Sequence, residues 1–351
     1  MSERKKKNVA IIGAGWWGVE VYLPALQARP DVELVAVNRL NQDALDQIVE
    51  RFGVPRGYTD ADEMLAKEDL DAVVITSPHV LHYEHARAAI EAGCHVLVDK
   101  PMTTNAGHAR ELVRRAKAKG VEILVPYGWN YLPFATTASD LIKSGRIGEV
   151  RHASCLMATH TYDLFGGRGL AEASEHMFQP QKSTWADPER AGGYGWGQLS
   201  HALGLLFRLI DLAPTEVYGL QTKSDAGVDL CDAAVLTLEN GARCSVSGSA
   251  LVPKHCSYQM DVRVYGSDGM LLIDMERTRM ELRRFDGTDE VVLDLGPDDG
   301  QYFAVEPINR LAEVCHGVHE RIEADGLVGQ RAIEVLDAMY RSFASGKVET
   351  V

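Results

Sequence analysis

Two segments far apart in the chain carry side chains suited to oxidising an alcohol. Lys100 stands in Val98-Asp99-Lys100-Pro101, and His201 ends a glycine-rich, aromatic run that starts at Gly192. Oxidation of a secondary alcohol removes a hydride from carbon and a proton from oxygen. An imidazole accepts that proton near neutral pH, and an ammonium group stabilises the developing negative charge on the oxygen. Lys100 and His201 are therefore candidates for catalysis, although on residue type alone a solvated lysine and a structural histidine are more common.

A glycine-rich turn near the start of the chain predicts a dinucleotide site. Residues 13–18 read Gly-Ala-Gly-Trp-Trp-Gly, which fits G-x-G-x-x-G between an apolar stretch and a helical pattern. Gly13 permits the tight turn, Gly15 lets the backbone approach a pyrophosphate, and Gly18 allows close packing of helix and strand. The start of the helix attracts the phosphates. We expect Trp16 and Trp17 to flank an NAD(P) cofactor, unless one of them only packs.

The end of the second predicted strand bears on the choice between NAD and NADP. Dinucleotide sites usually carry an acid here that binds the ribose, but this chain reads Val37-Asn38-Arg39 without a carboxylate. Asn38 is able to bind a ribose hydroxyl, and Arg39 to pair with a 2′-phosphate. These residues favour NADP slightly. The alternative is that Arg39 stacks on the adenine, which is compatible with either cofactor.

The pattern of elements predicts an α/β chain with two domains. An N-terminal domain, residues 1–127, is expected to be a Rossmann fold with a doubly wound parallel sheet, and residues 128–351 an α/β domain with a mostly antiparallel open sheet. In the first domain, strands are predicted at 8–13, 32–37, 71–76, 94–98 and 121–125, and helices at 18–28, 41–52, 80–92 and 105–119. In the second, strands are predicted at 149–160, 215–223, 230–239, 242–251, 259–265, 270–274, 279–285 and 290–294, helices at 134–144, 199–212, 304–318 and 327–344, and a long functional loop at 165–198.

Three further motifs make the chain resemble the Gfo/Idh/MocA family of oxidoreductases. They are Thr76-Ser77-Pro78-His79-Val80-Leu81-His82, the stretch AIEAGCHVLVDKPMTTN at 89–105, and the run at 192–201. The resemblance implies a Rossmann domain followed by a sheet domain that often forms subunit contacts, and hydride transfer between a nicotinamide and a secondary hydroxyl of a sugar, sugar derivative or cyclitol. It implies that Lys100 and His201 are catalytic. It also implies that Ser77, Pro78, His82, Lys100 and Pro101 help to build the cofactor pocket.

Two positions depart from the pattern of this family. Asp99 replaces the glutamate that usually precedes the lysine, which is a mild change. Gly197 stands where many relatives carry an aspartate, four residues before the histidine, and Gln198 is a candidate for part of that role. The substrate contacts are therefore expected to differ from those of inositol dehydrogenases.

Aromatic and polar residues near the predicted domain junction and in the long loop suit a sugar-like substrate. Aromatic faces pack on the apolar faces of a pyranose, and polar groups bind its hydroxyls. The alternative is that several of them pack the loop or a subunit interface. The predicted substrate-binding residues are Lys100, Trp129, Asn130, Tyr131, His160, Tyr162, Trp196, Gln198 and His201, with Thr161, Trp185 and Tyr194 beside them.

Composition narrows the class of protein. The 36 Lys and Arg against 50 Asp and Glu give a net charge of −14, which argues against nucleic acid and against an anionic membrane as partners. The six cysteines form no CxxC pair, which is typical of reduced thiols in a cytoplasmic protein. His79, His82 and His85 have no acid or cysteine to complete a metal site, so we predict no metal. We expect a homo-dimer or homo-tetramer.

Three functions remain open from the sequence. The first is a sugar or cyclitol dehydrogenase that releases NAD(P). The second is a redox-neutral, NAD-dependent glycoside hydrolase that keeps its cofactor, and the altered region at Gly197 and Gln198 leaves it open. The third is a non-catalytic protein that senses nucleotides.

Overall fold

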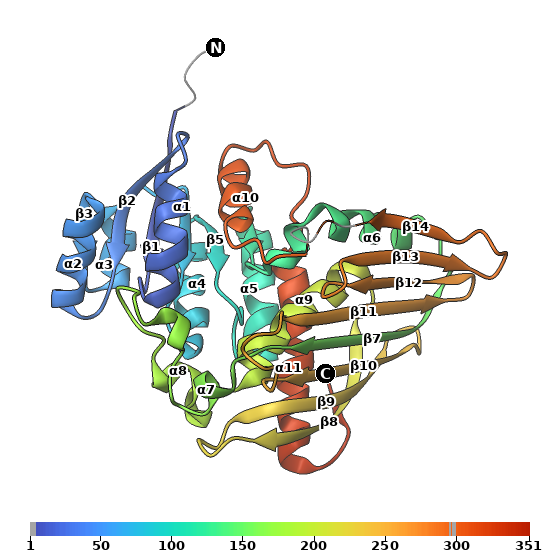
Figure 1. Ribbon diagram of the computed structural model, residues 1–351. Helices are drawn as coiled ribbons and strands as arrows, with labels where there is room; N and C mark the ends of the chain where they lie inside the picture. Colours follow the sequence, from blue (N-terminus) through green and yellow to red (C-terminus); the bar gives the residue numbers. More distant parts are fainter. Residues whose placement is uncertain (1–4, 295, 297–299) are drawn as a thin grey trace. The chain divides into compact units, whose positions relative to one another are not determined.

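The computed structural model describes residues 5–294, 296 and 300–351, and its contacts divide the chain into two compact units (Figure 1). The first unit comprises Met1–Pro126, Leu170–Gln181 and Ala304–Gln330, and the second comprises Tyr127–Gly169, Lys182–Phe303 and Arg331–Val351. Two segments that follow the predicted boundary at residue 127 thus fold with the N-terminal part. The predicted fold class, a parallel sheet with flanking helices followed by a mostly antiparallel sheet, is confirmed.

The first unit is built on a six-stranded parallel sheet with the order β3-β2-β1-β4-β5-β6. Its strands are β1 (Lys7–Ile12), β2 (Val32–Asn38), β3 (Arg56–Tyr58), β4 (Ala72–Ile75), β5 (His95–Val98) and β6 (Ile123–Leu124). Five of them were predicted. The sequence analysis missed β3, a three-residue edge strand that contains no apolar run. The chain order reverses between β1 and β4, which is where open α/β sheets bind ligands at the carboxyl ends of their strands.

Helices of the first unit begin and end where side chains and glycines satisfy the backbone. Asn41, Asp60 and Asn105 each accept a hydrogen bond from a backbone N–H in the first turn of a helix. Gly53 and Gly120 end α2 and α5 in the left-handed conformation. These helices are η1 (Gly18–Tyr22), α1 (Leu23–Gln27), α2 (Gln42–Phe52), α3 (Ala61–Lys67), η2 (His79–Leu81), α4 (His82–Glu91), α5 (Ala106–Lys119), η4 (Ala171–Ala173) and α10 (Glu306–Cys315).

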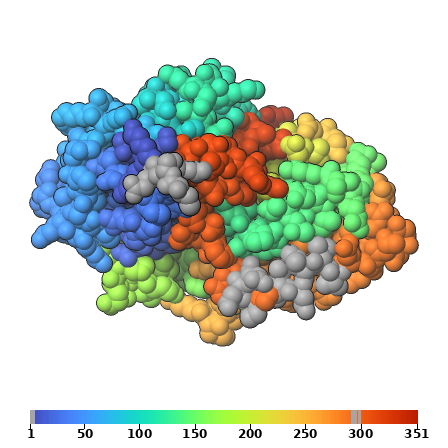
Figure 2. Space-filling view, turned by 90° about the horizontal axis from the view of Figure 1, so that it is seen from above, coloured from blue at the N-terminus to red at the C-terminus, as the bar shows by residue number. Residues whose placement is uncertain are grey.

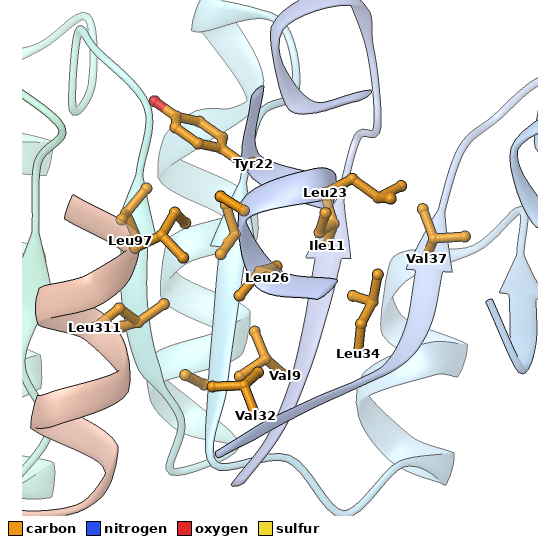
Figure 3. Packing of buried hydrophobic residues seen from close by; sticks show 14 of the residues in the cluster. Val9, Ile11, Tyr22, Leu23, Leu26, Val32, Leu34, Val37, Leu97 and Leu311 are labelled. Carbon is orange, nitrogen blue, oxygen red and sulfur yellow. The ribbon is translucent and has the colours of Figure 1, made fainter. Parts of the chain in front are cut away.

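One buried cluster joins β1, β2 and the helix after the glycine turn (Figure 3). Val9 and Ile11 from β1 pack with Leu23 and Leu26 of α1, while Leu311 from α10 enters the same cluster. Figure 2 shows the surface of the segment around α10 directly beside the N-terminal part of the chain. This core fixes the turn between β1 and η1.

The second unit is built on a nine-stranded sheet with the order β14-β13-β12-β11-β7-β10-β9-β8-β15. All neighbours are antiparallel except β7 and β10, which run parallel. The strands are β7 (Val150–Ala158), β8 (Pro214–Lys223), β9 (Asp229–Leu238), β10 (Arg243–Ser249), β11 (Gln259–Gly266), β12 (Gly269–Asp274), β13 (Arg279–Arg284), β14 (Glu290–Asp294) and β15 (Glu349–Thr350). Only β15, two residues long, lacks a counterpart in the sequence analysis.

Helices of the second unit include several short turns in the segment predicted as a loop. The helices are η3 (Gly128–Tyr131), α6 (Pro133–Lys143), α7 (Tyr162–Phe165), α8 (Lys182–Trp185), η5 (Pro188–Arg190), η6 (Gly195–Leu199), α9 (Ser200–Leu209) and α11 (Gly326–Ser345), whose first turn belongs to the first unit. The long loop predicted at 165–198 therefore contains several short helical turns that the sequence did not indicate. Turns of three to five residues are too short to give a periodic pattern.

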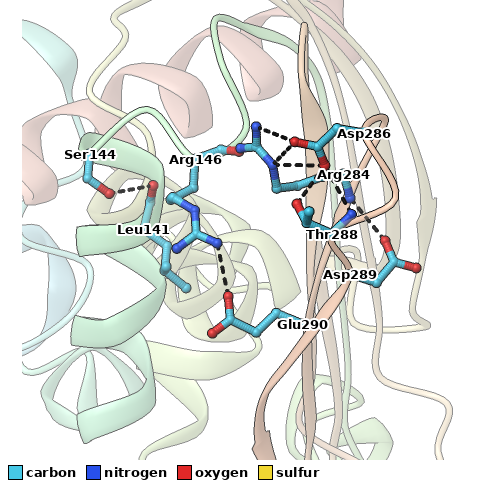
Figure 4. Close-up of polar contacts among 8 residues, drawn as sticks. All are labelled: Leu141, Ser144, Arg146, Arg284, Asp286, Thr288, Asp289 and Glu290. Atoms are coloured by element: carbon cyan, nitrogen blue, oxygen red, sulfur yellow. Dashed lines mark hydrogen bonds and ion pairs between the residues drawn. The ribbon is translucent and has the colours of Figure 1, made fainter.

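Polar contacts join the loop after α6 to the hairpin between β13 and β14 (Figure 4). Arg146 Nη2 pairs with Glu290 at 3.0 Å, and Arg284 donates to the Arg146 carbonyl oxygen and pairs with Asp286. Exposed pairs of this kind contribute only about 0–1 kcal/mol each. Their contribution to the stability of this sheet edge is therefore small.

Candidate active site

The glycine turn has room for a ligand at only one of its glycines. Gly13 has φ +74°, and a Cβ there would lie 2.5 Å from Ser77 Cα. A Cβ on Gly18 would collide with the Thr76 hydroxyl. At Gly15, in contrast, the nearest atoms would lie 3.6 Å away, an ordinary contact distance. Gly13 and Gly18 are thus needed by the fold, whereas Gly15 leaves open space beside the backbone, as close approach of a pyrophosphate requires.

Asn38 and Arg39 are both engaged within the first unit. Asn38 is buried, its Oδ1 accepts from Gly13 N at 3.2 Å, and its Nδ2 donates to Tyr58 O at 3.1 Å. Arg39 Nη1 donates to Ala14 O at 2.6 Å, and burial lowers the pKa of its guanidinium. Asn38 therefore braces the glycine turn, and its contact with a ribose stays a prediction.

The two tryptophans of the turn have different surroundings. Trp17 packs against the hydrophobic cluster of the first unit and meets Tyr22 edge-on, with 6.5 Å between ring centroids. Trp16 donates through Nε1 to His176 Nδ1 at 2.7 Å. Of the two alternatives stated for this pair, packing applies to Trp17, and Trp16 is the better candidate to flank a cofactor.

His82 joins the loops that follow β4 and β5. It is buried, and its two ring nitrogens lie 2.7 Å from the carbonyl oxygens of Ser77 and Pro101. Burial lowers the pKa of His82. The Ser77 hydroxyl lies 2.9 Å from His85 Nδ1. The predicted pocket residues Ser77, His82 and Pro101 thus form one hydrogen-bonded group, with Pro78 partly exposed beside them.

Lys100 follows β5 at the carboxyl edge of the parallel sheet. Burial lowers the pKa of its ammonium group, while the charge of Asp99 opposes this effect. Asp99 Oδ1 accepts from Lys100 N at 2.9 Å and from the Tyr22 hydroxyl at 3.4 Å, and burial raises its pKa. The Lys100–Pro101 peptide bond is cis. A lysine with a lowered pKa at this edge is suited to exchange or share a proton with a bound oxygen.

In the second unit, three aromatic rings enclose His201. The imidazole is 5% exposed and meets Tyr127, Trp129 and Tyr302 edge-on, with ring centroids 5.9, 5.4 and 5.2 Å away. Trp129 Nε1 donates to Gly300 O at 3.0 Å, which fixes this ring. Such an enclosure excludes water and orients the imidazole. The sequence analysis missed Tyr127 and Tyr302; the pair Tyr302-Phe303 in a polar stretch was the available signal.

One carboxylate anchors the turn that leads into His201. Asp229 is 1% exposed; its Oδ2 accepts from Gly195 N at 2.6 Å and its Oδ1 from the Tyr340 hydroxyl at 2.7 Å. Trp196 stacks flat on Tyr340, with 4.8 Å between centroids. Burial raises the pKa of neighbouring Asp232 well above its usual value. Asp229 and Asp232 were not among the predicted residues, and two acids in an otherwise apolar strand were the available signal.

The remaining candidates for substrate binding have varied positions in the second unit. Asn130 is buried and donates to Gly204 O at 2.9 Å, so it also holds α9. His160 stacks on Tyr258, and Tyr162 lies under the Arg168 guanidinium. Trp196 is buried against Tyr340. Their contacts with a substrate stay predictions, as do those of Trp129 and of Tyr131, Thr161, Trp185 and Tyr194.

The structure explains the glycine at position 197. A Cβ there would lie 2.9 Å from Phe165 Cζ and 3.0 Å from Trp185 Cζ3, so two rings fill the space that a longer side chain would need. Gln198, in contrast, is the only residue of the stretch 192–200 that is not buried. Gln198 is therefore available to a ligand.

We also searched the described residues for a metal site and for a membrane-spanning helix. No cluster of three His, Cys, Asp or Glu side chains there has a geometry that would hold a metal ion. The six cysteines are free thiols. Within the part of the chain that the structure describes, no helix combines the length and apolar character needed to cross a membrane.

Comparison with known proteins assigns the family. Residues 7–127 match the model of the oxidoreductase family with an NAD-binding Rossmann fold, and residues 135–272 match the GFO/IDH/MocA C-terminal domain. D-xylose 1-dehydrogenase (NADP(+)) 2 of Haloferax volcanii is 26% identical, over 96% of this chain and 97% of that protein. The scyllo-inositol 2-dehydrogenase (NADP(+)) IolU of Bacillus subtilis is 26% identical over 85% of both chains.

Other relatives match over a shorter part of the sequence, and solved structures match in fold. Identities of 30% and 34% occur over 151 and 146 residues, which span 40% and 43% of the related proteins. The WlbA dehydrogenase from Bordetella pertussis, solved with NADH and UDP-GlcNAcA, has a TM-score of 0.77 at 21% identity and covers 99% of both chains. With both domain models matched in order, this chain belongs to the Gfo/Idh/MocA family of NAD(P)-dependent oxidoreductases.

Proposed function

We propose that this oxidoreductase transfers a hydride between NAD(P) and a secondary hydroxyl of a sugar, sugar derivative or cyclitol. The glycine turn carries the proposal, because Gly15 leaves open space beside the backbone while Gly13 and Gly18 have none. The named substrates of two relatives, xylose and scyllo-inositol, support the substrate class. A bound nicotinamide would supply the hydride acceptor or donor.

Lys100 and His201 carry the proton chemistry in this proposal. The Lys100 ammonium donates a hydrogen bond to the substrate oxygen and stabilises its negative charge during oxidation. His201 takes the hydroxyl proton and returns it in the reverse direction. The ring enclosure by Tyr127, Trp129 and Tyr302 supports this role, since it holds the imidazole away from bulk water. Trp129, Tyr302 and the partly exposed Gln198 are the residues that we assign to sugar binding.

For the cofactor we propose a preference for NADP. The supporting observation is that the strand end offers a guanidinium and no carboxylate: Arg39 lies beside the glycine turn, bonded to Ala14 O at 2.6 Å. A 2′-phosphate pairs well with arginine, whereas an acid at this position would repel it.

We further propose that the enzyme works as a homo-dimer or homo-tetramer in the cytoplasm. Tyr218, Leu220 and Val235 are exposed apolar residues on neighbouring strands β8 and β9, and Leu156 is exposed on β7. An open sheet face of this kind suits contact with a second copy. The free thiols suit a reducing compartment.

The test is a screen of sugars, cyclitols and glycosides with NAD and with NADP, which follows both nicotinamide absorbance and product. A dehydrogenase gives net reduction of the dinucleotide in proportion to product. Release of an aglycone without net reduction would instead support the redox-neutral hydrolase. Dinucleotide binding without product from any compound would support the nucleotide sensor and contradict the proposal.

A further inference from the structure

The segment Leu170–Gln181, which we name the strap, belongs by its contacts to the first unit, although the chain on both sides of it belongs to the second. It is the stretch between α7 and α8 in Figure 1. It contains only the single turn η4 (Ala171–Ala173) as regular structure. Contacts with the first unit, and not a helix or strand of its own, must therefore fix its course.

The first of these contacts is made to the glycine turn itself. Trp16, inside the Gly13–Gly18 motif, donates from Nε1 to Nδ1 of His176 at 2.7 Å. The two rings are nearly parallel, with 25° between their planes and 6.2 Å between centroids. Because Nδ1 accepts this bond, His176 is held in the tautomer that carries its proton on Nε2.

The second contact is made to the end of β2. The Arg39 guanidinium lies over the ring of Phe178, with its Cζ 4.2 Å from the ring centroid. Between these two side chains, Met177 N donates to Glu20 Oε1 at 2.9 Å, at the start of the helix that follows the turn. Met177 and Phe178 also pack against the hydrophobic cluster of the first unit.

These contacts surround the open side of the turn. Trp16 is the direct neighbour of Gly15, and a Cβ built on Gly15 would lie 3.6 Å from both Arg39 Nη1 and Gly13 O. The strap thus rests on the two side chains that border the place where the backbone is free to approach a pyrophosphate. The strap side chains His176 and Phe178 therefore contact the residues that border this place.

We propose that His176 and Phe178 are cofactor-retaining residues: the strap forms the outer wall of the dinucleotide site and slows release of the bound nucleotide. This inference rests on the proposed function, since it requires that the glycine turn binds NAD(P). The proposal adds His176 and Phe178, from the predicted long loop, to the residues of the Rossmann motifs that form the dinucleotide site.

The experiment measures dissociation rates. Purified protein is loaded with NADPH, or with NADH if that binds more tightly, and chased with excess oxidised dinucleotide while energy transfer from tryptophan to the reduced nicotinamide is followed. H176A and F178A are each expected to release the nucleotide on the order of tenfold faster, as loss of a hydrogen bond or a cation–π contact predicts. Association should change less than about threefold.

Two conservative variants and one control separate retention from a general structural effect. H176Q keeps an acceptor for Trp16 and F178Y keeps the ring, so both should restore slow release. E175A changes an exposed residue of the strap next to His176 and should release the nucleotide at the wild-type rate. Rates within about twofold of wild type in both H176A and F178A would overturn the inference while the proposed function stands.

A second measurement needs no variant. Hydrogen exchange of the strap peptide in the wild-type protein should slow when NADPH is added, because a wall that closes on a ligand opens less often. Unchanged exchange at saturating nucleotide would contradict the inference. Wild-type protein that binds neither NADPH nor NADH would remove the proposed function together with the strap's role.

Discussion

The glycine turn gives the sharpest test of the cofactor site, because two of its glycines should respond in opposite ways to the same methyl group. In G15A, the new Cβ meets its nearest atoms at 3.6 Å, so the fold should accept it with a change in unfolding free energy within about 1 kcal/mol. In G13A, the Cβ would lie 2.5 Å from Ser77 Cα, and φ is +74°. The strained backbone and the overlap together should cost about 2–5 kcal/mol.

G15A, which should fold normally, should nevertheless lose affinity for the dinucleotide. A phosphate oxygen that bonds a backbone N–H lies about 2.9 Å from the nitrogen, which leaves no space for a methyl group on the neighbouring Cα. G15A should therefore weaken NADPH binding at least ~10-fold, or about 1.4 kcal/mol. Urea unfolding measures the free energy of unfolding, and titration of tryptophan fluorescence measures the affinity for NADPH. G15A that folds normally and binds NADPH with wild-type affinity would refute the assignment of the pyrophosphate to this turn.

Three further predictions concern the catalytic, cofactor and buried acidic groups. K100A and H201A should each lower kcat at least ~100-fold with an unchanged circular dichroism spectrum, and near-normal turnover in either would remove that residue from the mechanism. R39A should weaken NADP binding at least ~10-fold and NAD binding less than about threefold; equal losses would favour adenine stacking over 2′-phosphate pairing. The pKa of Asp232 is raised in the fold above the usual value of 3.8, so stability is lost as pH rises above that value. D232N should therefore have a larger free energy of unfolding than wild type at neutral pH. This difference should be small in acid and grow by up to ~1.4 kcal/mol per pH unit between the usual and the raised pKa of Asp232; a difference independent of pH would contradict this.

The elements with strong periodicity were predictable, and the short ones were not. Strands such as β1 and β4 are buried on both faces, so their sequences are continuous apolar runs. Such short apolar runs are typical of buried parallel strands. β3 and β15 have two or three residues and gain their place only by pairing with β2 and β8. Such pairing depends on long-range contacts, for which a local sequence window holds no signal.

The residues of the candidate site also fall into a group that the sequence could predict and a group that it could not. Motif positions such as Gly13 and Lys100 could be predicted from the sequence, because a turn or a strand end constrains which residue types fit there. Tyr302, Asp229 and His176 have no such local constraint: their roles come from what the fold brings beside them, namely His201, the turn at Gly195 and Trp16. Predicting them from one sequence would have required knowing the topology of both sheets first.

The position of the strap changes how the long segment before His201 should be understood. The sequence suggested that its aromatic residues serve the substrate, yet Phe178 and His176 contact residues of the first unit, while Trp196 packs against Tyr340 and Trp185 fills the space at Gly197. One continuous stretch of chain therefore contacts the glycine turn at one end and carries His201, the proposed proton-transfer residue, at the other. If a bound nucleotide orders the strap, as we propose, the restriction falls about twenty residues before His201 in the chain, and we expect cofactor retention and placement of the imidazole to be coupled through this segment. Loosening the strap in F178A should thus raise KM for the sugar as well as the rate of nucleotide release, whereas a strap without this link would alter release alone.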